Sequence, residues 1–359
     1  MRRIIGLTLA GVGAFLIVVA ILVRTYLPGQ LIKYPLNEYL KTQLSGTGVQ
    51  YFSPSKIHEI SGANMLVTST VKGDAAAGSS STAVWNGFTY LYDTTNSLPF
   101  EYSSRRFAFD RRSAELVTCC GANVGGDSSI KQTGLVGFLW PFGTQQITYQ
   151  VFDPAINKPE PARFAGTSTI DGIPVNRYVE HVTHVSDGTV TLPGSLVGMS
   201  GTSSVTLPEW YTATNTFWVD PETGAQLNTT QTQSLTLEDS TGATKLVILD
   251  GTLKFTPQSL HTVVGLDNTA RSELSLVQVI LPLVLGVLGF IALVVGIVLA
   301  QTRRGGQAEA AEDTIPQPAA HGPADYPALT VRAGRLISTL SMRPAACCRP
   351  PGLSCGRPA

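Results

Sequence analysis

Charged residues are scarce in this sequence. Asp, Glu, Lys and Arg make up 14% of its 359 residues, whereas soluble chains usually carry about a quarter. A basic surplus is also missing, because residues 24 to 278 contain 16 Lys and Arg against 21 Asp and Glu, a balance of −5. Nucleic-acid binding depends on basic groups that neutralise phosphates, so this composition argues against a nucleic-acid partner.

Common enzyme signatures are absent as well. Residues 1–301 contain no Gly-x-Ser-x-Gly, no Gly-x-x-x-x-Gly-Lys and no His-Glu-x-x-His motif. His181 and His184 are three positions apart, and on a regular strand such positions face opposite sides, so they would not share a metal ion. We therefore expect no enzyme, no catalytic residue, no cofactor and no metal.

Cysteine is rare, with five residues in the whole sequence. Cys119 and Cys120 are adjacent in the Gly-rich stretch "LVTCCGANVGGD", which is typical of a turn. In an oxidising compartment the two could form a vicinal disulfide, remain free thiols or bridge to another molecule. Redox catalysis is not expected, because that chemistry favours Cys-x-x-Cys spacing.

Two long hydrophobic runs stand out instead. Residues 4–23 and 276–300 contain no charged residue, and about 20 apolar residues are enough for a helix to cross a bilayer. The first run could alternatively be a signal peptide. Its apolar part is longer than a usual signal core and no Ala-x-Ala-like site follows, which favours an uncleaved anchor.

The charges flanking these runs predict their orientation. Arg2 and Arg3 precede the first run, and Arg303 and Arg304 follow the second. By the positive-inside rule, both termini are expected in the cytoplasm of a multi-pass protein of the plasma membrane. The predicted division is cytoplasmic 1–3, transmembrane 4–23, extracytoplasmic 24–275, transmembrane 276–301 and a disordered cytoplasmic tail 302–359, which is rich in Gly, Ala, Pro and Arg.

Small residues recur in both runs at spacings of three or four. They are Gly6, Ala10 and Ala14 in the first run, and Gly289, Ala292 and Gly296 in the second. Such spacing lets helices approach closely in lipid, so these residues are candidate helix-packing positions. The alternative is that Gly and Ala are simply common in membrane helices.

The chain between the two hydrophobic runs has the composition and turn spacing typical of a β domain. Thr, Val, Gly and Ser dominate, and turn signals such as Asp171-Gly172 and Asp187-Gly188 recur at short intervals. This pattern predicts a mainly β, antiparallel extracytoplasmic domain, either a barrel or a sandwich, between N- and C-terminal transmembrane helices. Residues 25–45 show a rough helical stripe of Leu and Tyr, which predicts an amphipathic juxtamembrane stalk.

Two stretches give the clearest strand predictions. In "LWPFGTQQITYQVFD", Trp140 and Phe142 are expected to close one end of the core, and residues 147–152 alternate as in a strand. In "NTFWVDPETGAQLNTTQ", Trp218 should face away from its two neighbours. The sequence Asp-Pro-Glu-Thr-Gly that follows predicts a hairpin turn.

Four arginines bracket the sequence "FAFD". Arg105, Arg106, Arg111 and Arg112 could together bind an anionic lipid headgroup or a glycan. The alternative is a solvated face whose charges are balanced by nearby acidic residues.

Three separate blocks resemble the actinobacterial PorA-like family, formerly a domain of unknown function with a porin label. They are "FLWPFGTQQITYQVFD" (138–153), "GIPVNRYV" (172–179) and "NTFWVDPETGAQL" (215–227). The resemblance covers about residues 1–304 and implies a cell-envelope membrane protein with a channel or transport role. The layout also resembles class B scavenger receptors, which carry an anchor at each end of a lipid-handling β-rich domain.

Two functional hypotheses follow. A membrane β-barrel turns an apolar band outward and has no long apolar helix, so a channel formed by this chain would need helices from several copies in a homo-oligomer. The alternative is a doubly anchored ectodomain that contacts the bilayer and binds an envelope lipid, a glycolipid or a protein partner, without forming a pore.

Overall fold

The computed structural model describes residues 2–199, 201 and 203–301, in which twelve strands form one antiparallel sheet. The strands are β1 Tyr39–Ser53, β2 His58–Gly73, β3 Thr82–Asp93, β4 Leu98–Asp110, β5 Leu116–Val117, β6 Asn123–Val124, β7 Tyr149–Asp153, β8 Lys158–Ile170, β9 Ile173–Leu192, β10 Val205–Val219, β11 Gln226–Glu238 and β12 Thr244–Phe255. The helical elements are α1 Arg2–Thr25, α2 Leu27–Leu31, the 3₁₀ turn η1 Gly194–Val197, α3 Pro257–Ser275, the π-helical turn η2 Leu276–Ile280 and α4 Leu281–Gln301.

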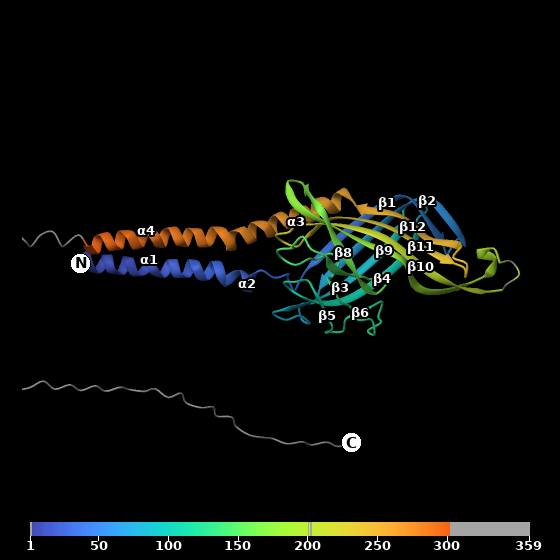
Figure 1. Ribbon diagram of the computed structural model, residues 1–359, viewed down its shortest axis with the longest axis horizontal. Coiled ribbons are helices and arrows are strands. Elements are labelled where there is room, and N and C mark those ends of the chain that lie inside the picture. The colour runs from blue at the N-terminus through green and yellow to red at the C-terminus, as the bar shows by residue number, and fades with distance from the viewer. Residues whose placement is uncertain (1, 200, 202, 302–359) are drawn as a thin grey trace, which may run out of the picture. The chain divides into compact units, whose positions relative to one another are not determined.

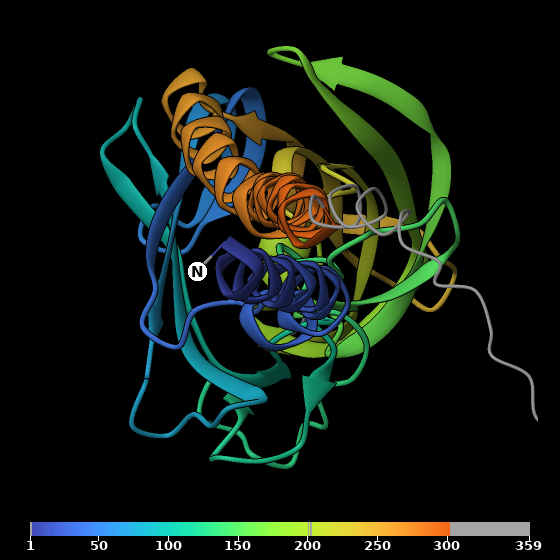
Figure 2. The same cartoon turned by 90° about the vertical axis from the view of Figure 1, so that its left-hand side faces the viewer.

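The sheet is built almost entirely from sequential hairpins. Its order is β5-β4-β3-β2-β1-β12-β11-β10-β9-β8-β7, with β6 paired to β4. The pairing of β1 with β12 brings together the first long strand and the last one, so the two halves of the meander form one continuous surface. The sheet curls into a half-barrel (Figure 2). The predicted antiparallel β domain between two apolar helical segments is therefore confirmed.

A short segment around Leu135 links the two edges of the half-barrel. The Leu116 amide donates to the Gly134 carbonyl at 2.8 Å, on the β5 side. On the β7 side, the Leu135 amide donates to the Gln150 carbonyl at 2.7 Å, and the Phe152 amide donates to the Leu135 carbonyl at 3.0 Å. The chain thus uses the unpaired groups of both edge strands, which would otherwise be open to pairing with other chains.

Trp140 and Phe142 close one end of the core, as predicted. Trp140 is fully buried and stacks on Tyr178 with ring centroids 4.5 Å apart. The rings of Phe142 and Tyr34 pack together with their centroids 4.7 Å apart. The predicted start of the following strand is wrong, because Ile147 is 51% exposed and β7 begins two residues later.

The predicted hairpin is also confirmed. Phe217 and Val219 are buried in β10 while Trp218 is only half-buried, as alternation requires. Gly224 ends the turn at a φ of +73°, a region that L side chains rarely adopt. It also lies so close to the Trp140 carbonyl that no Cβ could fit.

The predicted helical stalk over 25–45 is not formed. The helix α2 ends at Leu31, and the chain is already in β1 from Tyr39 onward. Leu44 is buried in the sheet core, between β2 and β12. The spacing of the Leu and Tyr residues in this stretch is compatible with a helix and with a strand. Hydrogen bonding to two neighbouring strands favours the strand.

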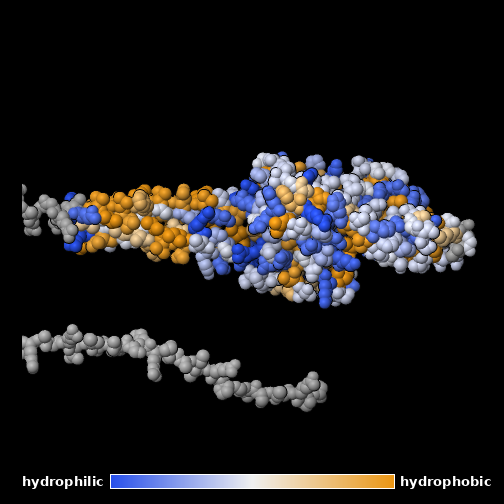
Figure 3. Space-filling model, in the orientation of Figure 1, coloured by the Kyte–Doolittle hydropathy of each residue, from blue (hydrophilic) through white to orange (hydrophobic). Residues whose placement is uncertain are grey.

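Two helices are long and apolar enough to cross a membrane, Arg2–Thr25 and Pro257–Gln301. The second is continuous from α3 through η2 into α4, and its polar first part, α3, contacts the sheet. α1 and α4 lie side by side (Figure 1), and their surface is predominantly hydrophobic (Figure 3). The predicted disordered tail, 302–359, lies outside the described residues.

The two helices are antiparallel and meet along glycines. A Cβ added to Gly6 would lie 2.8 Å from the Ala300 nitrogen, and a Cβ added to Gly289 would lie 2.8 Å from the Gly13 carbonyl oxygen. The predicted residues Gly6, Ala10, Gly289 and Gly296 lie in this contact, and Ala292 is half-buried. The prediction that Ala14 is a packing position is wrong, because Ala14 is exposed and the neighbouring Gly13 lies in the contact instead. The buried small residues repeat every seven positions (Gly6, Gly13, Ala20; Gly289, Gly296), the period of a coiled-coil seam.

Candidate functional site

A cavity of about 480 Å³ lies where the helices meet the half-barrel. Its walls are mostly apolar and include Leu40, Trp85, Phe138, Phe142, Leu266 and Val277. The polar contributions include Lys33, Glu38, Asp267 and Glu273. This volume falls within the range of about 300–1,000 Å³ typical of ligand pockets, which are also mainly apolar with a few polar groups.

One wall is the linker between α2 and β1, which backbone contacts hold in place. The Tyr34 amide donates to the Arg111 carbonyl at 2.8 Å, and the Arg111 Nε donates back to the Tyr34 carbonyl at 2.6 Å. The Trp85 indole donates to the Pro35 carbonyl at 3.2 Å. The linker is therefore an ordered wall, although it has no regular secondary structure.

The opposite wall is α3, whose N-terminus is anchored on the sheet. The Thr256 side chain caps the helix by accepting the Ser259 amide at 3.2 Å. The Ser259 hydroxyl accepts the Gln43 amide of β1 at 2.7 Å. Val264 then packs with Leu227 in the core, so α3 stays against the domain before it continues into η2 and α4.

A buried polar cluster borders the cavity at the turn between β10 and β11. Thr223 donates its hydroxyl to Asp267 at 2.5 Å, and Arg271 pairs with Asp220 at 2.7 Å and with Glu222 at 3.0 Å. Asp220 is 0% exposed and Asp267 is 2% exposed. Burial, together with hydrogen bonding to and repulsion from Asp220, raises the pKa of Asp267 well above its usual range.

The four predicted arginines do not form one patch. Arg105 lies over the rings of Phe107 and Phe152 at 4.9 and 4.5 Å, and burial lowers its pKa to about 9. Arg106 instead pairs with Asp74 at 2.9 Å. Arg111 is tied to the linker described above, and Arg112 is exposed. Neighbouring positions on β4 point to opposite faces, which separates the first two guanidinium groups.

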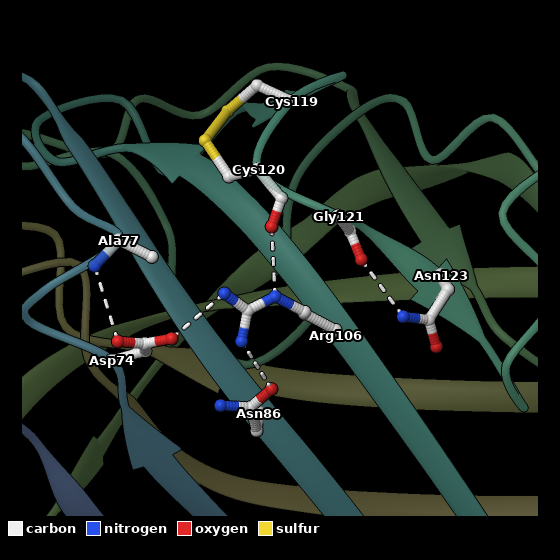
Figure 4. Close-up of polar contacts among 8 residues, drawn as sticks. All are labelled: Asp74, Ala77, Asn86, Arg106, Cys119, Cys120, Gly121 and Asn123. Carbon is white, nitrogen blue, oxygen red and sulfur yellow. Dashed lines mark hydrogen bonds and ion pairs between the residues drawn. A yellow bond between two sulfur atoms is a disulfide. The ribbon is translucent and has the colours of Figure 1, made fainter.

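Cys119 and Cys120 are joined as a vicinal disulfide (Figure 4). The Cys120 carbonyl accepts a hydrogen bond from the Arg106 Nε at 2.9 Å. The turn therefore connects to the Arg106–Asp74 ion pair on the sheet, away from the residues that line the cavity.

The two histidines lie on the same face of β9, contrary to the alternation argument. His181 contacts the Thr214 hydroxyl at 3.1 Å, and His184 stacks on Trp210 at 4.1 Å. The strand has a bulge between them, seen as a φ of +51° at His184 and a register shift against β10. Within the described residues, no three His, Cys, Asp or Glu side chains are grouped so as to hold a metal ion.

Two buried acidic residues inside the half-barrel were not predicted from the sequence. Glu180 is 1% exposed and accepts a bond from Asn215 at 2.7 Å, and burial raises its pKa to about 8. Burial also raises the pKa of Asp153 to about 6. Glu180 alternates with buried Tyr178 and Val182 along β9, so period-two alternation was a signal that could have placed it inside.

Comparison with known proteins places the whole described architecture in one family. The family model described as Porin PorA matches residues 5–298, which include both apolar helices and the complete sheet. No curated protein matches the chain significantly.

Proposed function

The chain belongs to the porin PorA family, and we propose that it is a cell-envelope protein, anchored at both ends, that binds a lipid in the juxtamembrane cavity. The lipid would be an envelope lipid or glycolipid whose acyl chain enters the cavity. The proposed function is binding of lipid at the membrane surface, without a catalytic step.

The cavity carries this proposal. It is lined by residues of both the sheet and the helices. Two of them, Leu31 at the end of α2 and Val277 in η2, lie next to the apolar helices α1 and α4 in the chain. Leu276, next to Val277, is 52% exposed and Leu31 is 58% exposed, so apolar side chains are exposed on the helical segments beside the cavity. Burying an acyl chain there is favourable by about 25 cal/mol for each Å² of apolar surface removed from water.

We also propose that both termini lie in the cytoplasm and that the sheet lies outside. The antiparallel contact of Gly6 with Ala300 supports this, because it places the two ends of the membrane helices on the same side. The basic residues Arg2 and Arg3 at that side support a cytoplasmic location.

Mass spectrometry of lipid extracted from the purified full-length protein tests the binding function. We expect a bound lipid at near-equal molar ratio, and its loss in Ala270→Trp, which fills the cavity from α3. Asn268→Trp is the matched control, since Asn268 is exposed on the same helix and does not line the cavity. Equal lipid content in both variants, or none in the unmodified protein, would refute the proposal.

A channel is the second candidate, and the family description favours it. The hydrophobic surface of the described residues in Figure 3 is concentrated on the helices, whereas the sheet domain shows a mixed, mostly polar surface. A lipid-facing barrel would need an apolar band around its strands. A pore would therefore be formed by helices of several copies.

A further inference from the structure

Two positively charged side chains lie at the end of the cavity nearest to the apolar helices. Lys33 lines the cavity and follows α2 by two residues. Arg24 is in the last turn of α1, and its Nη1 donates to the Gln278 carbonyl in η2. Val277, the residue before Gln278, also lines the cavity. Because α1 and α2 both contact η2, the two cations border the same end of the cavity.

The contact with η2 holds the Arg24 guanidinium in place and leaves two of its nitrogens available. η2 is a π-helical turn, a form that is frequent at functional sites. Nη1 is used by the Gln278 carbonyl, whereas Nε and Nη2 bond to no other residue in the part of the chain that the structure describes. These two nitrogens form one side of the planar guanidinium, which can donate two parallel hydrogen bonds to a phosphate.

Lys33 has no acidic partner among residues 2–199, 201 and 203–301. Its ammonium group makes no ion pair or hydrogen bond there, although the residue is half-buried. Of the acids in the lining, Glu38 accepts the backbone amide of the following residue, and Asp267 is bonded to Thr223. Glu273 is exposed on α3. The Lys33 ammonium is therefore available to an anion that enters this end of the cavity.

The segment that carries both cations has no negative charge. Residues 24–35 contain Arg24 and Lys33 and no acidic residue. With both termini in the cytoplasm, as proposed above, this segment lies on the extracytoplasmic side, where short flanks of membrane helices carry fewer basic residues. Arg112 approaches the segment from the sheet, since its Nη1 would lie 3.8 Å from a Cβ added to Gly29. Three cations therefore surround α2 where it meets the cavity.

We propose that the cavity selects an anionic phospholipid, whose phosphate is held by Arg24 and Lys33 beside η2. Its acyl chain lies against apolar residues at the sheet end of the cavity, such as Trp85 and Phe138. The cavity binds lipid as proposed above, on which this assignment rests, but it favours lipids with a phosphate headgroup. An uncharged glycolipid would leave both cations without a counter-charge. Arg112 adds to the positive potential around α2.

Cross-linking from two lipids that differ only in their headgroup tests this proposal. Full-length protein in micelles of an uncharged maltoside detergent receives phosphatidylglycerol or uncharged monogalactosyldiacylglycerol, each with the same photoreactive acyl chain. Mass spectrometry then measures cross-links on lining residues of α3, such as Leu266 and Ala270. We expect about fivefold more cross-linking from phosphatidylglycerol, because one exposed ion pair changes affinity by up to about fivefold and two cations act together.

Variants of the two cations identify the source of this preference. Lys33→Gln and Arg24→Gln should each lower the phosphatidylglycerol signal by up to about fivefold. Both should leave the galactolipid signal unchanged, which shows that the cavity is intact. Lys56→Gln is the matched control, because Lys56 is exposed beyond the opposite end of β1 and should keep the unmodified preference. Arg24→Lys, which retains the charge, should keep most of it.

Equal cross-linking by the two lipids would overturn the phosphate assignment and leave lipid binding in place. A preference that persists in both Gln variants would also overturn it. The same conclusion follows if soluble glycerol phosphate competes as well as unlabelled phosphatidylglycerol, because the acyl chain would then contribute nothing. Absence of cross-links from either lipid would refute the lipid-binding function, and the phosphate assignment with it.

Discussion

Gly13 of α1 lies directly against the backbone of Leu293 in α4, so close that no side chain could be placed between them. In lipid, helices associate mainly through such close packing, because apolar side chains gain nothing from leaving a solvent that is equally apolar. The seam of small residues is therefore the main contact that holds the two apolar helices together.

Enlarging Gly13 should separate the helix pair. We expect Gly13→Leu to lower the stability of the protein in detergent by about 1–3 kcal/mol, the usual cost of overpacking. Gly11→Leu is the control, because Gly11 is exposed on the same helix and a Cβ added to it would have no neighbour within 4 Å. Thermal unfolding of both variants measures the difference, and equal melting temperatures would contradict the seam.

Tyr34 should be important for closing the end of the core that faces the apolar helices. Its buried hydroxyl donates to the Trp140 carbonyl, and burial raises its pKa. We expect Tyr34→Phe to destabilise the protein by about 1–3 kcal/mol, because a buried carbonyl loses its best donor. Tyr39→Phe, at a position 66% exposed, is the control and should have little effect on urea unfolding. A larger loss in the control would refute this role for the Tyr34 hydroxyl.

The sequence predicted the elements whose signals are local. The apolar runs, the Asp-Pro-Glu-Thr-Gly turn and the alternation around Trp218 depend on neighbouring residues and were confirmed. Features that depend on distant pairing were missed. Thr223 and Asp267, for example, are 44 residues apart, and their contact follows from the path of α3 across the end of the sheet.

The error at Ala14 has the same origin. Spacings of four and seven are both present among the small residues of α1, and sequence alone does not say which face meets a partner. The antiparallel register with α4 selects Gly13, which faces Gly289 and Leu293. Arg105 and Arg106 are likewise adjacent in sequence but lie on opposite faces of β4.

Stability should depend on pH through Glu180. Its pKa is raised by burial from the usual 4.5 to about 8, so the folded protein keeps a proton that the unfolded chain releases. Stability should therefore fall as pH rises from about 4.5 to about 8, by up to about 1.4 kcal/mol for each pH unit, and then level off. Glu180→Gln should flatten this part of the curve, measured by urea unfolding at several pH values. An unchanged slope, or the same flattening in exposed Glu115→Gln, would argue against Glu180 as its source.

Planar bilayers can decide whether the helices conduct. If copies of α1 and α4 line a pore, purified protein should give discrete conductance steps, and Gly296→Leu should abolish them, because Gly296 lies against the backbone of Ala10. Gly286→Ala should keep them, since the added carbon would meet Ala20 at 4.0 Å, an ordinary contact. Neither span has an ionisable residue between Ile4 and Val23 or between Leu276 and Gln301 that would mark a polar path. Silence at high protein load, with the lipid still bound, would therefore favour the lipid-binding function over a channel.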